Sequence, residues 1–303
     1  MEVTESSVLL LPFTASSVGV ARRHLVSDLI EAGVRAPAVT DAALVISELL
    51  SNALQHAGPL PGSSIRVAWD LDGDSVRVSV SDGGGPTQPE PGQPTLTTTG
   101  GRGLRIVARL SRRWGTLCDD DGTTVWAEVL VMPLESVAVP AAAAESGGLA
   151  DEPRPRSGNS KLALNLATWL PGARHGKVRL VELNVSSRFH DDHTIVTICG
   201  EIDLYTAPRL HSELAGLLAE DMPARVVIDM SGVEFCDSTG MNVLLSCLRQ
   251  ARERGGELEI AAPKPAVRKI LQVTGLDSVF TLVEDTDPRG PLGLSRPKPA
   301  VPQ

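Results

Sequence analysis

The stretch Phe235-Cys236-Asp237-Ser238-Thr239-Gly240-Met241 decides the fold of the second half of this chain, because it marks the change from a strand to a helix. The β-branched segment Arg225–Met230 precedes it and predicts a strand. Met241, Leu244, Leu245 and Leu248 follow at helical spacing. We therefore predict Ser238 as the N-cap of the helix, with an exposed hydroxyl at the positive end of the helix dipole, where a phosphate group is well tolerated. A capping serine without any further role is the alternative.

Length and charge limit the classes of function. A chain of 303 residues is long enough for two domains, each with its own core. Lys and Arg total 28 against 37 for Asp and Glu, which gives a formal charge of -9, and there is no basic run. Because nucleic-acid binding depends on neutralising phosphates, we expect no direct nucleic-acid partner.

Cysteine use and the absence of targeting signals predict the cellular compartment. The four cysteines have no paired short spacing, and we expect reduced, buried thiols rather than a disulfide framework or a zinc site: Cys118, Cys199, Cys236 and Cys247. The first residues lack the basic and apolar regions of a signal peptide, and no apolar run approaches the length that spans a bilayer. We therefore expect a cytoplasmic protein without membrane association.

Composition divides the chain into two domains and two connecting or terminal segments. We predict a first domain over residues 1–134 and a second over residues 178–286. Between them, residues 135–177 are rich in Ala, Pro, Gly and Ser, as is typical of a linker. Residues 287–303 repeat Pro with little apolar content, which predicts a disordered tail.

Both domains are predicted to belong to the α/β class, each with a sheet and helices packed on it. For the first domain the expected elements are a strand at 8–13, helices at 16–33 and 38–57, a hairpin of 65–71 with 76–80, a helix from about 102, and a hairpin of 113–118 with 123–131. The first hairpin turns at Asp72-Gly73, a strong hairpin signal. For the second domain we expect strands at 178–185, 194–200, 225–230, 257–261 and 279–283, and helices starting at 206–208, after 238 and at 266–273. The first domain is thus predicted as a two-layer α/β sandwich.

The second predicted helix carries a polar face beside its apolar one. Its apolar residues recur at a spacing of 3.6 residues and form the expected core face, while Glu48 and Asn52 lie one turn apart on another face. Two interpretations remain open for this pair: a solvated polar stripe, or a base and a metal ligand that face a pocket. Arg22 and Arg23 on the preceding helix are candidates for a partner contact, with ordinary solvated arginines as the simpler alternative.

Two glycine-rich segments follow. Asp82 ends a predicted strand and precedes Gly83-Gly84-Gly85, and a carboxylate there can accept a hydrogen bond from an exocyclic amine while glycines let a flat ring approach the backbone. The segment Gly100-Gly101-Arg102-Gly103 leads into a helix, and backbone N–H groups at such an entry bind phosphate. Each segment alone is also compatible with a plain turn.

Taken in this order, these motifs resemble the ATP-binding domain shared by gyrase, histidine kinases and the bacterial anti-sigma-factor serine kinases, over about residues 8 to 132. Residues 48–57 are similar to the N box of that superfamily, residues 82–85 to its first glycine box and residues 101–103 to its second. The resemblance implies ATP and Mg²⁺ as cofactors. It also implies the following roles: Glu48 as general base, Asn52 as the Mg²⁺ ligand, Asp82 as the acceptor from the adenine amine, Gly84 as part of the first glycine box, and Gly101 and Gly103 as residues that bracket the triphosphate. A carboxylate that takes a hydroxyl proton during phosphoryl transfer also agrees with first principles. Because no histidine-bearing hairpin precedes the domain, we expect a serine kinase rather than a histidine kinase.

The second domain resembles the STAS domain of anti-sigma-factor antagonists, over about residues 178 to 286. The resemblance is carried by Gly200-Glu201-Ile202-Asp203 and by Asp237-Ser238-Thr239-Gly240. In that family the serine after the aspartate is the phosphoacceptor, which implies Ser238, with Thr239 as the less favoured acceptor.

We expect from these resemblances a partner-switching regulator of a sigma factor, in which a protein serine/threonine kinase domain is fused to an anti-sigma-factor antagonist domain that is phosphorylated on Ser238. Expected partners are an anti-sigma factor or a sigma factor, and antagonist proteins. The alternative is a catalytically inactive nucleotide-binding scaffold whose STAS domain binds a separate anti-sigma factor. An ATP hydrolase has less support, because the mechanical domains of such enzymes are absent. Relatives of this type often form homodimers, and the sequence leaves the oligomeric state open.

Overall fold

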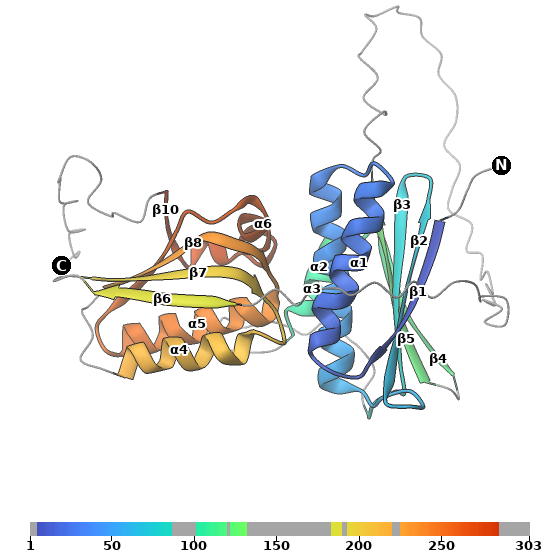
Figure 1. Ribbon diagram of the computed structural model, residues 1–303, viewed down its shortest axis with the longest axis horizontal. Coiled ribbons are helices and arrows are strands. Elements are labelled where there is room, and N and C mark those ends of the chain that lie inside the picture. Colours follow the sequence, from blue (N-terminus) through green and yellow to red (C-terminus); the bar gives the residue numbers. More distant parts are fainter. Residues whose placement is uncertain are drawn as a thin grey trace, which may run out of the picture.

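The structure is a computed structural model that describes residues 5–86, 101–119, 122–131, 183–189, 193–219 and 225–284. These residues form two α/β domains that lie side by side (Figure 1). The first domain contains β1 (Glu5–Pro12), α1 (Ser16–Glu31), α2 (Ala36–His56), β2 (Ser64–Asp72), β3 (Ser75–Asp82), α3 (Gly103–Leu110), β4 (Arg113–Asp119) and β5 (Gly122–Leu130). The second contains β6 (Asn184–Phe189), β7 (Thr194–Ile202), α4 (Ala207–Ala219), β8 (Arg225–Cys236), α5 (Ser238–Glu253), β9 (Glu257–Ala261), α6 (Pro265–Thr274), the 3-10 turn η3 (Leu276–Ser278) and β10 (Thr281–Val283). The predicted fold class is confirmed.

The first domain is an antiparallel five-stranded sheet in the order β1-β2-β3-β5-β4, with helices on one face. Side chains alternate along each strand, so Val76, Val78 and Val80 point into the core while the residues between them point away from it. The predicted hairpin turn is present, and Gly73 adopts a φ of 58°, a left-handed conformation that favours glycine. On α2 the predicted apolar face is buried, with Ile46 and Leu50 fully excluded from solvent.

The second domain is a mixed five-stranded sheet in the order β10-β9-β8-β7-β6, in which β6 is antiparallel to its neighbour and the other strands are parallel. Of the strand predicted at 178–185, residues 178–182 lie outside the described residues, and the described strand continues past the predicted end to Phe189. Its register pairs Asn184 with Cys199 and Phe189 with Thr194, the first residue of β7. The predicted strand at Glu257–Ala261 is confirmed residue by residue.

The prediction that all four cysteines are buried is wrong for two of them. Cys236 and Cys247 are buried, whereas Cys118 and Cys199 are exposed. Cys118 lies near the end of β4, which is the edge strand of its sheet. Cys199 follows Ile198 on β7, and strand alternation turns Ile198 inward and Cys199 outward.

The helices of the first domain lie between its sheet and the second domain (Figure 1). Ala43 and Leu44 on α2 and Ile106 on α3 belong to the same buried apolar cluster as core residues of the second domain, such as Val267 and Leu271. The two domains therefore share a continuous apolar contact, which removes nonpolar surface from water and favours their association.

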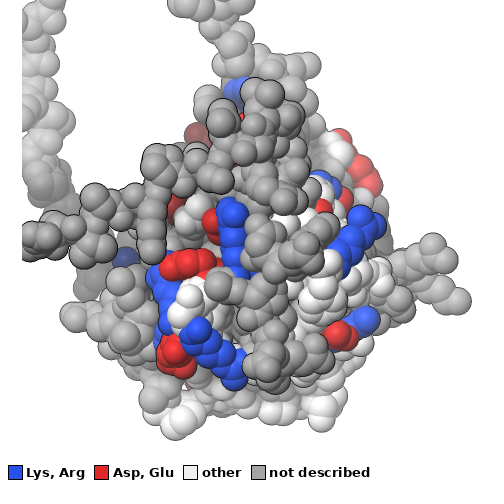
Figure 2. Space-filling model, turned by 90° about the vertical axis from the view of Figure 1, so that its left-hand side faces the viewer, with Lys and Arg blue, Asp and Glu red and all other residues white. Residues whose placement is uncertain are grey.

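Several predictions concern residues that the structure does not describe. The linker at 135–177 and the tail at 287–303 lie outside the described residues. Within the described part of the chain, no helix is long and apolar enough to cross a membrane. Figure 2 views the molecule from the end of the second domain, and among the described residues on that face basic and acidic side chains are interspersed without a continuous patch of either sign.

Candidate functional site

Asp237, and not Ser238, is the N-cap of α5, so the predicted cap is wrong by one residue. The backbone of Asp237 is extended, with φ -102° and ψ -173°, and its Oδ1 accepts hydrogen bonds from the backbone N–H groups of Thr239 at 2.8 Å and Gly240 at 3.1 Å. The carboxylate thus satisfies two of the unpaired N–H groups at the helix end. Ser238 is the first residue of the helix. Because its hydroxyl does not cap the helix, it can make another contact.

That contact is with Glu48 of the first domain. The Ser238 hydroxyl donates to Glu48 Oε2 at 2.6 Å, and the Ser238 backbone N–H donates to Glu48 Oε1 at 2.8 Å. Ser238 is only 8 % exposed as a result, so the prediction of an exposed hydroxyl does not hold in this arrangement of the domains. The structure brings the predicted base and the predicted phosphoacceptor, 190 residues apart in sequence, into direct hydrogen bonding.

This pair is buried and lies near two further carboxylates, those of Asp237 and Asp203. Glu48 is 2 % exposed, and burial raises its pKa to about 7, against the opposing effect of the two hydrogen bonds from Ser238. Burial also raises the pKa of Asp237 well above its usual value, and repulsion from Glu48 and Asp203 adds to the effect. A carboxylate with a pKa near 7 can exchange its proton at neutral pH, which suits a general base.

The second glycine box lies next to the same carboxylate. A Cβ atom at Gly103, the first residue of α3, would stand 2.7 Å from Glu48 Oε2, so only glycine lets the start of the helix approach this closely. Gly101 has a φ of 83°, which also favours glycine, and it is exposed at the start of the described segment. The backbone N–H groups at the start of α3 therefore lie beside the Glu48–Ser238 pair. Such N–H groups can bind phosphate, and here they would hold it next to this pair.

Asp82 lies at the end of β3, as predicted, and is 3 % exposed. Its Oδ1 accepts from the backbone N–H of Gly84 at 2.8 Å, and Gly84 has a φ of 80°. Burial raises the pKa of Asp82, while the Gly84 bond opposes the shift. The loop is tied to the segment after α2 by backbone bonds from Gly83 to the Gly58 carbonyl and from Gly58 to the Gly84 carbonyl.

Asn52 is half-buried on α2, one turn beyond Glu48, and the first glycine box lies near the end of the same helix. Helix α2 therefore carries the predicted base, the predicted Mg²⁺ ligand and the approach to the predicted adenine site in that order, along roughly 12 Å at 1.5 Å per residue. Gly103 lies against the Glu48 carboxylate and Asp82 is held in place by the Gly84 N–H, and these residue types would suit the phosphates and the adenine amine of a nucleotide. Among the described residues, Glu48 is hydrogen-bonded to Ser238 and lies next to Gly103. Asn52 lies on the same helix as Glu48, and Asp82 lies in the loop near the end of that helix.

The sequence interpretation missed an ionic contact between the domains. The Arg22 guanidinium on α1 donates to Glu201 at 2.7 Å and to Asp203 at 2.8 Å, and it stacks on the Phe235 ring at 3.9 Å from the centroid. Arg23 adds a second bond to Glu201 at 2.7 Å. Arg22 is 2 % exposed, so the expectation of a solvated arginine is wrong there. Burial alone would lower the pKa of Arg22, but the two ion pairs outweigh it and raise that pKa.

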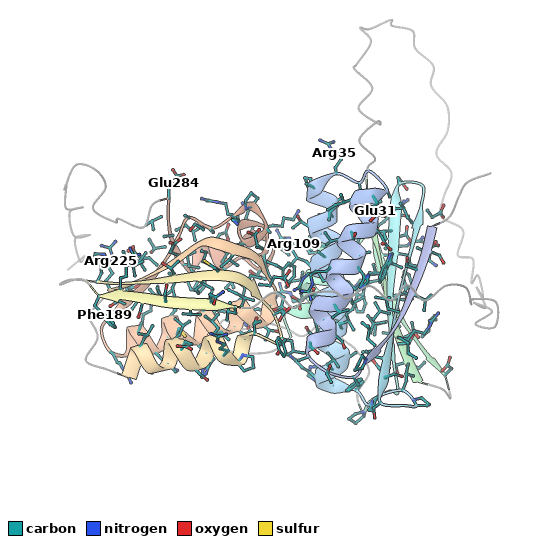
Figure 3. The ribbon with its side chains drawn as sticks, in the orientation of Figure 1. Glu31, Arg35, Arg109, Phe189, Arg225 and Glu284 are labelled. Atoms are coloured by element: carbon teal, nitrogen blue, oxygen red, sulfur yellow. The ribbon has the colours of Figure 1, made fainter. Side chains whose placement is uncertain are left out.

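Two further contacts extend this interface at α6. Lys269 pairs with Asp41 at 3.0 Å, and Arg109 donates to the Val273 carbonyl at 3.1 Å. Arg109 lies at the junction of the two domains in Figure 3. In the ionic part of this interface, Gly200-Glu201-Ile202-Asp203 is marked by a sequence motif, but the motif does not indicate which arginine pairs with it.

Both halves of the chain match known domain families. Residues 11–129 match the histidine kinase-like ATPase domain, and residues 184–287 match the STAS domain. The anti-sigma-B factor antagonist of Bacillus subtilis (strain 168) is 26% identical over 102 residues, which are 34% of this chain and 92% of that protein.

Two solved structures are also similar in sequence. An anti-sigma factor antagonist from Mycobacterium paratuberculosis is 33% identical, and the match covers 35% of this chain and 89% of that chain with a TM-score of 0.33. A structure of the RsbU and RsbW domains of Rv1364c from Mycobacterium tuberculosis is 26% identical and covers 42% of this chain and 32% of that chain with a TM-score of 0.34.

Proposed function

The chain joins a histidine kinase-like ATPase domain of the anti-sigma-factor kinase type to a STAS domain of the anti-sigma-factor antagonist family, and we propose on that premise that it is a partner-switching regulator that phosphorylates its own Ser238. The observation that carries the proposal is the 2.6 Å hydrogen bond from the Ser238 hydroxyl to Glu48. A nucleophile and a base in this geometry are ready for proton removal. The proposed domain boundaries remain 1–134 and 178–286.

In the proposed reaction, bound Mg-ATP supplies the γ-phosphoryl group. Asp82 would accept a hydrogen bond from the adenine amine, Gly84 would let the ring approach the backbone, and Asn52 would hold the Mg²⁺ ion. Gly101 and Gly103 would offer backbone N–H groups to the phosphates. The catalytic work of the protein is then to place these groups and to hold the acceptor.

Glu48 and Ser238 carry the transfer itself. Glu48 Oε2 takes the hydroxyl proton as Ser238 Oγ forms a bond to the γ-phosphorus and the bond from that phosphorus to the bridging oxygen breaks. The products are phosphoserine, ADP and a protonated Glu48. Because its pKa is raised by burial, Glu48 holds this proton near neutral pH and releases it when the domains separate and water returns.

The product state disfavours the docked arrangement. Phosphorylation adds roughly -1.5 to -2 charges at Ser238. The added charge would face Glu48, a hydrogen bond away, and Asp237, the neighbouring residue, and all three residues are buried. We therefore expect the phosphorylated STAS domain to leave the ATPase domain, so that each domain presents a surface that was covered. The partners proposed for these surfaces are an anti-sigma factor for the STAS domain and a sigma factor or further antagonist proteins for the ATPase domain.

Transfer within one chain is feasible if residues 135–177 form the flexible linker that their composition predicts. A flexible chain of about 40 residues spans on the order of 35 Å and would keep the tethered domain at an effective concentration in the millimolar range. Transfer within the chain should therefore have a rate that does not change when the protein is diluted.

Incubation of the purified full chain with Mg-ATP, followed by mass-spectrometric mapping of phosphate, tests the proposal. We expect phosphate on Ser238 at a concentration-independent rate, and none in Ser238→Ala, Asn52→Ala or Asp82→Ala. Nucleotide binding without transfer, to the chain itself or to added antagonist proteins, would instead support the catalytically inactive scaffold.

The pH dependence of transfer follows from the raised pKa of Glu48. Only the ionised carboxylate can take a proton, so the single-turnover rate should rise with pH, pass its half-maximum at about pH 7 and level off above it. At two pH units below the midpoint, we expect a rate about 100-fold lower than the plateau. Rapid-quench measurements between pH 5 and about 9 check this profile. A rate that stays level through pH 7 would contradict a base with this pKa.

Docking should respond to pH in the opposite sense. The pKa of Glu48 is raised above its ordinary value in the docked state, so its contribution to docking is fully present below that ordinary value and is lost as pH rises through about 7. The raised pKa of Asp237 acts in the same direction. The raised pKa of Arg22 keeps its guanidinium charged on both sides of this range, so its contacts with Glu201 and Asp203 continue to hold the domains together.

A further inference from the structure

The side chain of Arg102 reaches from the ATPase domain to the helix that carries the acceptor. Arg102 lies between Gly101 and Gly103, the two glycines proposed to line the phosphates, and it is 7 % exposed. Its Nη1 donates a hydrogen bond to the Asn242 side-chain oxygen on α5. An arginine has only donors to offer, so the Asn242 amide must present its oxygen here.

Asn242 lies close to Ser238 on α5, so a contact at Asn242 also constrains the position of Ser238. The two residues are four apart at the start of α5, so their side chains lie on the same face, one turn from each other. The first turn of α5 is thus held at two points, by Glu48 at Ser238 and by Arg102 at Asn242. Two contacts on one helix constrain the orientation of the STAS domain against the ATPase domain more tightly than one contact does.

Loss of the Arg102 contact carries a free-energy penalty, and this penalty can select one acceptor helix over another. Burial lowers the pKa of Arg102, and repulsion from Arg249 and Arg105 lowers it further. Among the described residues its hydrogen-bond acceptor is a neutral amide rather than a carboxylate. An acceptor helix without an oxygen at this position would leave a buried cationic donor without a partner, which is a penalty larger than the loss of an ordinary surface contact.

We propose that Arg102 is a positioning and specificity residue that recognises the acceptor helix through Asn242 and orients Ser238 toward Glu48. The proposal rests on the function proposed above and adds the feature by which the kinase domain selects its acceptor. It follows that STAS domains with a side-chain oxygen four residues after the acceptor serine are preferred substrates of this kinase domain. A STAS domain with an apolar residue at that position is a poor substrate of this kinase domain.

A matched pair of variants in the full chain isolates the oxygen. Asn242→Asp and Asn242→Leu have nearly the shape of the native side chain, but only the first keeps an oxygen that accepts from Arg102. We expect Asn242→Leu to lower the single-turnover rate of Ser238 phosphorylation about tenfold, as for the loss of one hydrogen bond to a charged group, and Asn242→Asp to stay within about threefold of the wild type. ATP affinity should not change in either variant, and Glu253→Ala, an exposed residue at the other end of α5, serves as the control.

Arg102→Ala completes a double-mutant cycle. In that background the difference between Asn242→Leu and Asn242→Asp should vanish, because the donor that distinguishes them is gone. A general loss of stability in α5 would leave the difference in place, so the cycle separates recognition from a merely structural role.

Docking is measured independently of activity by energy transfer between dyes on Cys118 and Cys199, the two exposed cysteines, one in each domain. Asn242→Leu should lower the docked fraction, and Asn242→Asp should preserve it. If the wild type makes no phosphoserine, the proposed function fails, while the docking measurement still decides the Arg102 contact. Equal docking of Asn242→Leu and wild type, or an undiminished Leu-to-Asp difference in Arg102→Ala, would overturn the inference.

Discussion

Replacing Glu48 with Gln is expected to slow phosphorylation of Ser238 by about 10²- to 10⁴-fold, the range that a positioned general base contributes. The amide keeps the size of the side chain and one oxygen that can accept from Ser238, but it cannot take a proton. In the structure both carboxylate oxygens of Glu48 are used by Ser238, and the side chain is almost completely buried. Solvent therefore cannot readily replace it as the base. Single-turnover transfer from labelled ATP measures the effect.

The control for this variant is the same substitution at an exposed residue outside the proposed site. Glu31→Gln, at the end of α1, should leave the rate unchanged. ATP binding, followed by calorimetry, should persist in Glu48→Gln, because Asn52, Asp82 and the glycine boxes are intact. A Glu48→Gln rate within threefold of the wild type would remove Glu48 from the catalytic role and leave it as a docking contact.

Replacing Ser238 with Asp is expected to lower the docked fraction at equilibrium by about 100-fold, since a new carboxylate would be buried against Glu48 and beside Asp237. The two existing carboxylates already have raised pKa values. A third would have to bind a proton or force the domains apart, and separation lets all three regain water. Energy transfer between Cys118 and Cys199 reports the change in docking.

Two companion variants show whether charge is the cause. Ser238→Ala removes one hydrogen bond to a charged group without adding charge, so its loss of docking should be about tenfold. Glu48→Gln in the Ser238→Asp background removes one of the repelling groups and should restore part of the docking. Equal docking of Ser238→Asp and Ser238→Ala would show that the phosphate does not act by electrostatic repulsion.

Local patterns in the sequence predicted most of the secondary structure. Helix α1 begins at Ser16 and β9 runs from Glu257 to Ala261, as apolar spacing and β-branched runs indicate. The secondary-structure predictions fail where a local sequence pattern competes with a hydrogen-bonding partner elsewhere in the fold. Residues 184–189 pair with β7, so the described strand extends to Phe189, beyond its predicted end at Val185. Asp237 out-competes Ser238 as the cap because its carboxylate accepts from two N–H groups.

Candidate residues were identified by type, but their arrangement was not. The motifs named Glu48, Asn52, Asp82, Gly84, Gly101, Gly103 and Ser238, and their roles in nucleotide binding remain proposals. Arg102 lies inside the second glycine box, to which the resemblance gives it no role of its own, and for Arg22 the sequence leaves open both a partner contact and a solvated side chain. No spacing rule connects Arg22 to Asp203 or Arg102 to Asn242, because 181 and 140 residues separate the partners.

The sequence by itself determined that there are two α/β domains and which residue types stand at the strand ends and helix starts, because helix and strand periodicity are properties of neighbouring residues. Only the tertiary structure decided that Ser238 meets Glu48, that Arg22 is buried against the STAS domain, and that a carboxyl group there titrates near neutral pH. These features arise from the contact of one domain with the other. Burial and charge at that contact depend on groups that the chain brings together only when both domains have folded and docked.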